Sequence, residues 1–268
     1  GLCFDDWGKR FVCSNRNPGQ HGVNRNRYHK KAPTVAITSV VQDVAAFAEN
    51  SRIYPSSKFW TTSNLHEGQF TAACGVFIYR GDLLPPEFRG NVFTCDPTGN
   101  LIHREIMEAK GATFTSKPAY EGKEFLASPD TWFRPVGMEL GPDGALYVAD
   151  MYRAVIEHPE WVPDELKNRP DERLGDDRGR IYRIVPKERN ASINDPSQPN
   201  MAKPLSRLHT IDLVKQLGNS NAWMRENAHR LLVETGDNAT RSLLEESLGE
   251  VKNPLKRLHA AWVIQQTR

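Results

Sequence analysis

The sequence predicts part of a β-propeller, about three blades, followed by HEAT-like α-solenoid repeats. Three observations lead to this fold class. A β-hairpin pattern recurs three times within residues 1–186, a glycine opens the first strand of each hairpin, and the spacing of apolar residues becomes helical after residue 204. We therefore divide the chain into propeller blades at residues 1–186, a linker at 187–204 and helical repeats at 205–268.

The clearest hairpin lies in residues 133–150, with the sequence FRPVGMELGPDGALYVAD. Residues 136–140 and 145–148 alternate between apolar and polar side chains with a period of two, which is typical of half-buried strands. The intervening Gly-Pro-Asp-Gly provides glycine where a tight turn requires a positive φ. This stretch therefore predicts two antiparallel strands joined by a tight turn.

The same order of features follows Gly1, Gly75 and Gly137. A third strand is predicted at residues 101–107 in the second blade and at 179–185 in the third. An ordinary all-β sandwich is the alternative interpretation. Propellers have about 4–8 blades, so three blades would not close a ring, and we expect this chain to be part of a longer one.

Composition and charge narrow the class of protein. The chain has 268 residues, of which 38% are hydrophobic and 25% charged, as in ordinary globular proteins, and its formal net charge is +2. A basic cluster at residues 25–31 contains a single aromatic, Tyr28, and so favours a solvated loop over a nucleic-acid surface. No apolar run reaches the ~18 residues of a spanning helix. We expect neither a nucleic-acid partner nor a transmembrane segment here.

The four cysteines fall at corresponding places in two hairpins. Cys74 precedes one strand and Cys95 ends its partner, and antiparallel pairing brings such positions together. Cys3 and Cys13 have a similar relation, although a slip of one residue would turn them to opposite faces. Disulfides are expected outside the cytoplasm and buried thiols within it, so both states stay open. The sequence contains no Cys-x-x-Cys, the motif of zinc ribbons and covalently attached haem.

The segments between these hairpins are mostly polar. Residues 14–33 predict a loop too polar for the core, and residues 34–53 predict a strand followed by a short helix or turn. The insert at 151–178 is rich in Pro, Asp, Glu and Arg, and inserts of this length are commonly functional or interfacial.

Beyond residue 204 the sequence predicts four helices. Ser206 is a candidate cap for the first, Gly236 ends the second at about residues 223–234, and the others cover about 243–248 and 255–266. Arg225 and Ala228 recur as Arg257 and Ala260, which suggests two helix-turn-helix units of HEAT type. An ordinary helical bundle is the alternative. In either case, Trp223 and Trp262 are expected in the core.

Several stretches together resemble a known family. The chain is similar to the PVC-type membrane-bound dehydrogenases, also called PVC-type haem-binding proteins, in the segments FDDWGKRFVCSN, FTAACGVFIYRGDLLPPEFRGNVFTCDPTGNLIHRE, FRPVGMELGPDGALYVADMYRAVIEHPEW and RGRIYRIVP. In that family a propeller similar to those of soluble pyrroloquinoline-quinone (PQQ) sugar dehydrogenases precedes HEAT repeats and a cytochrome c module. The cytochrome motif is missing here, so haem c would belong to a parent protein only.

The resemblance implies oxidation of a sugar or alcohol with PQQ and Ca²⁺, with electrons passing to the haem module. A second hypothesis, of another class, is a non-catalytic propeller that binds glycan or protein, with a partner protein docked on the helical repeats. Fold analogy does not choose between them, but the resemblance joins this propeller to an electron carrier, so we favour the dehydrogenase. The sequence contains no nucleophile motif such as Gly-x-Ser-x-Gly, so we do not expect a hydrolase. We expect a periplasmic or extracytoplasmic location.

Candidate site residues follow from propeller geometry, in which the loops that enter the first strand and leave the second lie at one mouth. These loops contribute Ser14, Asn15, Arg16 and His21, then His66, Glu67, Gln69, Asp96 and Asn100, and finally Arg134, Asp150, Tyr152 and Arg153. His66 or His21 would abstract the hydroxyl proton. Arg134 or Arg153 would hold the quinone, Asp150 or Asp96 would offer oxygen to Ca²⁺, and His21, Gln69, Asn100 and Tyr152 would line the cofactor site.

Structural roles are the alternative for most of these residues. Asp150 follows a strand and is suited to capping a neighbouring backbone, and Arg134 could pair with an acidic residue of the insert. His103 and Arg104 lie within a strand and are expected to face solvent or a neighbouring blade. The aromatic residues around the mouth serve either as packing or as sugar-stacking platforms: Trp132, Trp161 and Tyr152.

Overall fold

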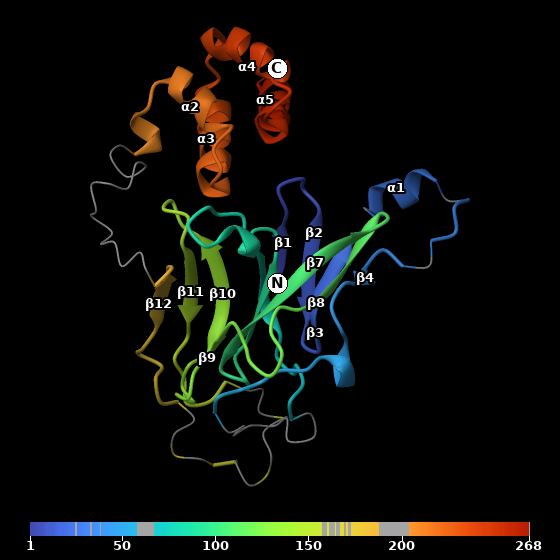
Figure 1. Cartoon of the computed structure of the whole chain (residues 1–268), viewed down its shortest axis with the longest axis vertical. Helices are drawn as coiled ribbons and strands as arrows, with labels where there is room; N and C mark the ends of the chain where they lie inside the picture. Colours follow the sequence, from blue (N-terminus) through green and yellow to red (C-terminus); the bar gives the residue numbers. More distant parts are fainter. Residues whose placement is uncertain are drawn as a thin grey trace. The chain divides into compact units, whose positions relative to one another are not determined.

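The structure is a computed structural model (Figure 1). It describes residues 1–24, 26–32, 34–37, 39–57, 67–156, 160, 164, 167–168, 170, 173–187 and 204–267. All of the predicted linker except residues 187 and 204, and part of the predicted insert, fall outside these residues. Two compact units make up the chain. We call residues 1–79, 90–139 and 147–183 the sheet unit, and residues 80–89, 140–146 and 184–268 the helical unit.

The first sheet has the strand order β1 (Leu2–Phe4), β2 (Arg10–Ser14), β3 (Asn17–Gly22) and β4 (Gln42–Asp43). The predicted hairpin is present as β1 and β2, with Cys3 opposite Phe11. The prediction of a loop at residues 14–33 was wrong in two places, because this stretch holds β3 and the helix α1 (Asn26–Lys31). Although β3 has the polar sequence NPGQHG, four of its six residues are buried. Beyond β4, a 3-10 helix, η1, covers Ala48–Asn50.

The second sheet has the order β5 (Cys74–Ile78), β6 (Val92–Asp96), β7 (Leu101–Lys110) and β8 (Thr113–Pro118), and β9 (Leu126–Ala127) also pairs with β7. A short 3-10 helix, η3 (Pro86–Phe88), lies between β5 and β6. Cys74 pairs with Cys95, and the register shifts before Phe77 pairs with Phe93. The predicted third strand is present as β7, whose first five residues are buried.

The third sheet contains β10 (Pro135–Leu140), β11 (Leu146–Asp150) and β12 (Arg180–Ile184), in that order. The predicted tight turn joins β10 to β11: Gly141 N–H donates to the Ala145 carbonyl, and Gly144 has a φ of 79°. Turn chemistry and period-two alternation thus identified both strands of this hairpin.

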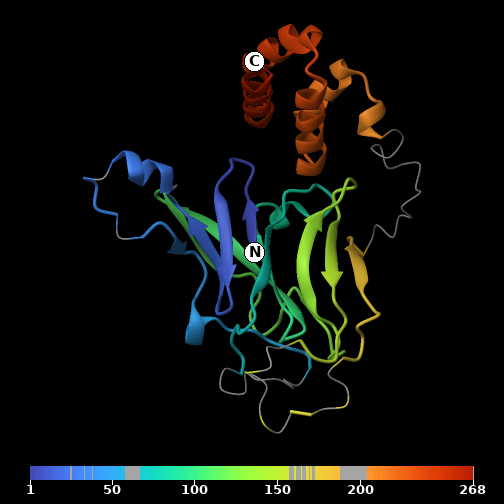
Figure 2. The same ribbon diagram turned by 180° about the vertical axis from the view of Figure 1, so that it is seen from behind.

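The first strands of the three sheets are neighbours (Figures 1 and 2). β5 packs against β1 and β2, and Gly75 of β5 closely approaches Val136 of β10. The predicted propeller is nevertheless wrong: the described residues form three antiparallel sheets of a sheet-rich fold, with no closed ring or barrel. Hairpin periodicity is a local property, and it does not encode how many sheets assemble or whether they close.

Four of the five α-helices in the described part of the chain follow residue 204. A 3-10 helix, η6 (Leu205–Arg207), precedes α2 (Thr210–Gln216), α3 covers Ala222–Thr235, and the 3-10 helix η7 (Asn238–Thr240) leads into α4 (Arg241–Leu248) and α5 (Pro254–Gln266). Ser206 lies in η6 instead of capping α2, which His209 precedes. Gly236 ends α3 with a φ of 58°, as the sequence predicts.

The prediction of HEAT-like solenoid repeats was also wrong. All four helices contribute to a single apolar core, including Leu213, Leu217, Leu232, Leu244 and Val263, so they form one cluster and not a stack of repeats. α2 and α4 have only 7 and 8 residues, too short to present the two-sided faces that stacked repeats need.

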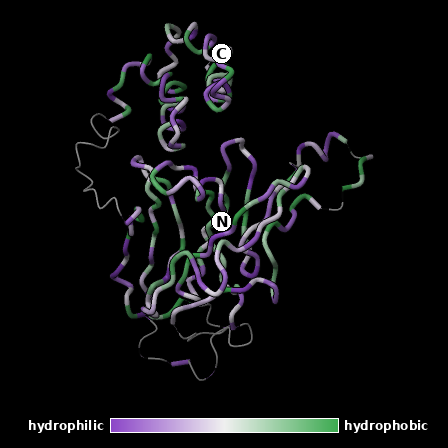
Figure 3. The backbone as a smooth tube through the Cα atoms, in the orientation of Figure 1, coloured by the Kyte–Doolittle hydropathy of each residue, from purple (hydrophilic) through white to green (hydrophobic). Residues whose placement is uncertain are grey.

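Hydrophilic and hydrophobic residues alternate over short distances along the chain (Figure 3). Among the described residues, no helix combines the length and the apolar character that crossing a membrane would require.

Candidate functional site

Asp150, the last residue of β11, organises the loops around it. Its Oδ1 accepts hydrogen bonds from the backbone N–H groups of Arg134 (2.7 Å) and Tyr152 (2.8 Å). The side chain is buried, and Oδ2 has no hydrogen-bond partner in the part of the chain that the structure describes. Asp150 therefore staples two loops with one oxygen and retains an unused acceptor on the other.

The buried Arg134 side chain connects its own loop to two other backbone segments, at Pro97 and at residues 153–154. Its Nη1 donates to the Pro97 carbonyl (2.7 Å), its Nη2 to the Ala154 carbonyl (2.8 Å) and its Nε to the Arg153 carbonyl (3.1 Å). Only 4% of the residue is exposed. A guanidinium with all three nitrogens bonded to the protein is poorly placed to hold an external anion, so its evident role is to position the loop that follows β11.

Asn100 joins the β6–β7 turn to the segment before β10. It has a φ of 55°, in the left-handed region that Asn tolerates. Its Nδ2 donates to the carbonyls of Phe133 (2.6 Å) and Thr131 (3.2 Å), and its Oδ1 accepts from the Ser57 hydroxyl (2.6 Å). Its side-chain oxygen and nitrogen are thus both engaged within the protein.

Asp96 occupies the end of β6, as Asp150 occupies the end of β11. Its Oδ1 accepts from the Gly99 N–H (2.8 Å), and its Oδ2 accepts from the N–H groups of Thr71 (3.3 Å) and Ala72 (3.4 Å). Complete burial raises the pKa of this carboxyl, against the opposing effect of the backbone hydrogen bonds. Both aspartates thus connect loops by accepting backbone hydrogen bonds. Asp96 uses both of its carboxylate oxygens in this way, whereas Asp150 uses only Oδ1.

An aromatic surface adjoins Asp150. The rings of Trp132 and Tyr152 lie 5.5 Å apart, and the Arg180 guanidinium stacks 3.2 Å from the centre of the Tyr152 ring. Tyr182, two residues beyond Arg180 on β12, is 40% exposed. Burial, and next the Asp150 carboxylate, raise the pKa of the Tyr182 phenol, which places that charge near an exposed side chain.

Arg153 completes this group. Its Nη1 is buried and, like Asp150 Oδ2, has no hydrogen-bond partner among the described residues. Buried polar atoms in proteins are almost always satisfied, so each of these two atoms is a point where water or an outside molecule can bind. We call these six residues the β11-end site: Trp132, Asp150, Tyr152, Arg153, Arg180 and Tyr182.

The other predicted site residues lie elsewhere. His21 is 3% exposed, bonds the Thr113 hydroxyl through Nδ1 (3.1 Å) and stacks on Phe11. Burial, the largest cause, lowers its pKa. Gln69 accepts a hydrogen bond from Arg16 (3.1 Å). His66, the candidate base, and Trp161 lie outside the described residues.

A buried charged cluster was not predicted. His103 and Glu105 lie two residues apart on β7, and His103 bonds Glu105 Oε1 (3.0 Å) through Nε2 and Glu124 Oε2 (2.7 Å) through Nδ1. We call these three residues the His103 cluster. Its side chains are at most 4% exposed, and Glu105 Oε2 is buried without a partner in the described chain. The two-residue spacing that puts His103 and Glu105 on one face of a strand could be read from the sequence. Nothing local in the sequence indicated that Glu124 would join them.

The cluster determines the charge of its histidine. Burial alone would lower the pKa of His103, but the hydrogen bonds to Glu105 and Glu124 overcome this and raise the pKa to about 9. His103 is therefore an imidazolium at neutral pH, held between two carboxylates. A protonated histidine cannot accept a proton, so His103 does not fit the role of a general base.

The comparison with known proteins identifies a family. Residues 1–188 match the model of a family described as a domain of unknown function, DUF7133. The chain belongs to the DUF7133 family. No curated protein and no solved structure matches the chain. The family description assigns no activity, and the resemblance to PVC-type dehydrogenases stays a prediction.

The DUF7133 sheet unit also contains the predicted cysteine pair. Cys74 and Cys95 are paired in register across β5 and β6, and the structure has all four cysteines as thiols. Burial, the largest cause, raises the pKa of Cys74 to about 12 and that of Cys95 well above its usual range. As thiols these side chains are unreactive core residues, because the thiolate is the nucleophile.

The Ca²⁺ and PQQ predictions for this DUF7133 member were compared with the donors present. Within the described ranges, no group of three or more His, Cys, Asp or Glu side chains converges as a metal site. Both carboxylate oxygens of Asp96 are used within the protein, for backbone N–H groups, and one of the two oxygens of Asp150 is. Both cofactors stay predictions, since His66 and part of the insert lie outside the described residues.

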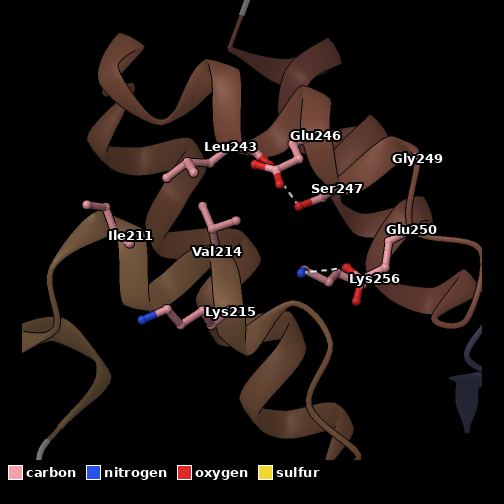
Figure 4. A pocket seen from close by; sticks show the side chains of 9 residues that line it. All are labelled: Ile211, Val214, Lys215, Leu243, Glu246, Ser247, Gly249, Glu250 and Lys256. Atoms are coloured by element: carbon pink, nitrogen blue, oxygen red, sulfur yellow. Dashed lines mark hydrogen bonds and ion pairs between the residues drawn. The ribbon is translucent and has the colours of Figure 1, made fainter.

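The helical unit has a separate open cavity of about 460 Å³ (Figure 4). The residues that line it are Ile211, Val214, Lys215, Leu243, Glu246, Ser247, Gly249, Glu250 and Lys256. Lys256 bonds Glu250 (2.6 Å), and Lys215 bonds Asp212 (2.8 Å). Both lysines that line this cavity are already paired with acids, so neither is freely available to an anionic ligand.

Proposed function

We propose that this DUF7133 member is a non-catalytic carbohydrate-binding module, and that a sugar ring stacks at the β11-end site. The observation that carries the proposal is the pair of Trp132 and Tyr152, 5.5 Å apart, beside two polar side chains with unused hydrogen-bonding capacity. Aromatic faces bind the C–H face of a sugar ring, and its hydroxyls require donors and acceptors nearby.

The polar half of the site can supply both kinds of group. Asp150 Oδ2 is an acceptor, Arg153 Nη1 is a donor, and neither has a partner among the described residues. Both atoms are buried, and the Asp150 carboxylate contributes to the raised pKa of Tyr182, a side chain that is 40% exposed. Arg180, also exposed, adds donors above the Tyr152 ring. This combination favours a neutral or acidic polyhydroxylated ligand.

The described side chains that were predicted to take part in oxidation make contacts within the protein instead. Arg134 and Asn100 bond backbone carbonyls, Asp96 bonds backbone N–H groups, and His21 packs against Phe11. These contacts support a binding role over a catalytic one. The PQQ-type sugar or alcohol dehydrogenase stays a prediction, and it depends on residues such as His66.

The test is a calorimetric titration of the full chain with a panel of neutral and acidic oligosaccharides. Trp132→Ala should weaken binding of any positive sugar by about tenfold or more, because a stacked ring contributes about 1 kcal/mol beyond its buried area. Trp132→Phe should recover part of the affinity. Trp7→Ala is the matched control, since Trp7 is 53% exposed in the turn between β1 and β2, away from these residues in the sequence.

Two results would contradict the proposal. Either no sugar binds, or Trp7→Ala weakens binding as much as Trp132→Ala does. The dehydrogenase prediction is examined with the same sugars by adding PQQ, Ca²⁺ and an electron-accepting dye. Turnover that Trp132→Ala reduces would show that the site belongs to an enzyme.

A further inference from the structure

Two histidines face each other across the helical unit. His229 on α3 and His259 on α5 come from helices that pack side by side within this unit. Their Nδ1 atoms lie 3.1 Å apart, and their rings are inclined at 78°. His259 is 5% exposed and His229 is half-buried.

The hydrogen bonds indicate which nitrogens carry protons. His229 Nε2 lies 3.3 Å from the side-chain oxygen of Gln266, which can only accept, so Nε2 carries the hydrogen. Nδ1 of neutral His229 is then a lone pair directed at His259. For the two Nδ1 atoms to bond, His259 must donate from its Nδ1. One hydrogen, carried by His259 Nδ1, therefore lies between the two Nδ1 atoms, and without it both atoms would direct lone pairs at the same point.

We propose that His229 and His259 form a binding site for a divalent transition-metal ion of the Ni²⁺, Cu²⁺ and Zn²⁺ class. The metal takes the place of the shared proton, and His259 stays neutral by changing tautomer, so that its one hydrogen is then on Nε2. Imidazole nitrogen suits these ions, whereas Mg²⁺ and Ca²⁺ prefer oxygen ligands. This site is independent of the carbohydrate proposal.

The separation of the nitrogens fits this class of ion. Two nitrogens each about 2.05 Å from one metal lie about 2.9 Å apart at a right angle and about 3.4 Å apart at the tetrahedral angle. The observed 3.1 Å lies between these values. Each ring would turn by about 40° to direct its lone pair away from the line between the nitrogens.

The surroundings resemble the outer shell of a metal site. A ligating histidine usually donates its second N–H to an oxygen, and Gln266 accepts in this way from His229. Trp262 lies 5.6 Å from His259 and 6.3 Å from His229, ring centre to ring centre. The described protein provides two ligands, so water completes the coordination.

The experiment titrates Ni²⁺ into the full chain at neutral pH and measures binding by calorimetry and tryptophan fluorescence. One saturable site is expected, with quenching of Trp262 by the paramagnetic ion. Zn²⁺ should displace Ni²⁺ and restore the fluorescence, and Mg²⁺ should not.

His229→Gln and His259→Gln should each weaken Ni²⁺ binding by tenfold or more. Glutamine retains hydrogen-bonding groups, and circular dichroism checks that each variant folds. His209→Gln is the matched control, because His209 is an exposed histidine of the same unit. Trp262→Phe should abolish the quenching but not the calorimetric signal. Unchanged Ni²⁺ affinity in both histidine variants, or no saturable binding, would overturn the proposal.

Discussion

Buried polar side chains in the sheet unit are held largely by the backbone of loops. Arg134 bonds three carbonyls, Asn100 bonds two at 3.2 Å or less, and Asp96 and Asp150 accept from N–H groups of neighbouring turns. Each side chain fixes segments that strand pairing alone would leave unconnected. Because a lost partner leaves a buried group unsatisfied, these residues are costly to replace for reasons unrelated to ligand binding.

The His103 cluster gives a prediction for pH. The pKa of His103 is raised from 6.5 to about 9 in the folded protein, so its stabilising effect is complete below pH 6.5 and is lost as the pH rises through 9. His103→Gln should therefore reduce the free energy of unfolding by at most about 3 kcal/mol below pH 6.5, and by much less near pH 9. Urea unfolding at both ends of this range measures the difference.

His209→Gln, which changes an exposed histidine, should show no such loss. If the wild-type protein and His103→Gln lose stability equally over this range, the imidazolium is not held by Glu105 and Glu124.

At the scale of elements, one close approach between two sheets depends on a glycine. Gly75 of β5 has a φ of 55° and lies where the register of β5 and β6 shifts. A Cβ at this position would lie 2.6 Å from the Val136 carbonyl oxygen of β10. Both the backbone conformation and the packing against β10 therefore require glycine here.

Gly75→Ala should lower the free energy of unfolding by about 2–4 kcal/mol, because it combines strain at a positive φ with a clash against backbone. Gly111→Ala separates the two effects: Gly111 has a similar φ of 59°, but nothing lies within 4 Å of its Cβ position. We expect that control to cost about 1 kcal/mol in the same thermal or urea unfolding experiment. Equal losses would show that the approach of β5 to β10 contributes nothing.

At the scale of the whole molecule, the two units have separate apolar cores. The core of the helical unit includes Leu217 and Ala228, both fully buried, and a core of the sheet unit includes Phe11 and Ile78. The β11-end site lies within the sheet unit, and the His229–His259 pair lies within the helical unit. The two proposed sites can therefore be perturbed separately.

Leu217→Ala should destabilise the helical unit by about 2–5 kcal/mol, the usual cost of a cavity in a packed core. Carbohydrate affinity at the β11-end site should stay within a factor of two of wild type, since none of its residues belongs to that core. Thermal unfolding and calorimetric titration of the same variant test both statements. A parallel loss of stability and sugar binding would show that the units are energetically coupled.

Several elements could be predicted from the sequence because their signals are local. Period-two alternation and the Gly-Pro-Asp-Gly turn predicted β10 and β11, Gly236 predicted the end of α3, and Pro254 the start of α5. Turn and cap preferences arise within a few residues, so they are readable without the fold. The capping role proposed for Asp150 can be read in the same way, from its position at the end of a strand.

The rest was decided by tertiary structure. The polar NPGQHG became a buried strand because Phe11 and Phe114 enclose His21, and His103 became an imidazolium because Glu124, 21 residues away, reaches it. The arrangement of three antiparallel sheets, and the gathering of four helices around one core, were likewise absent from the local pattern. Burial and charge depend on partners distant in sequence, and periodicity along one strand or helix carries no record of them.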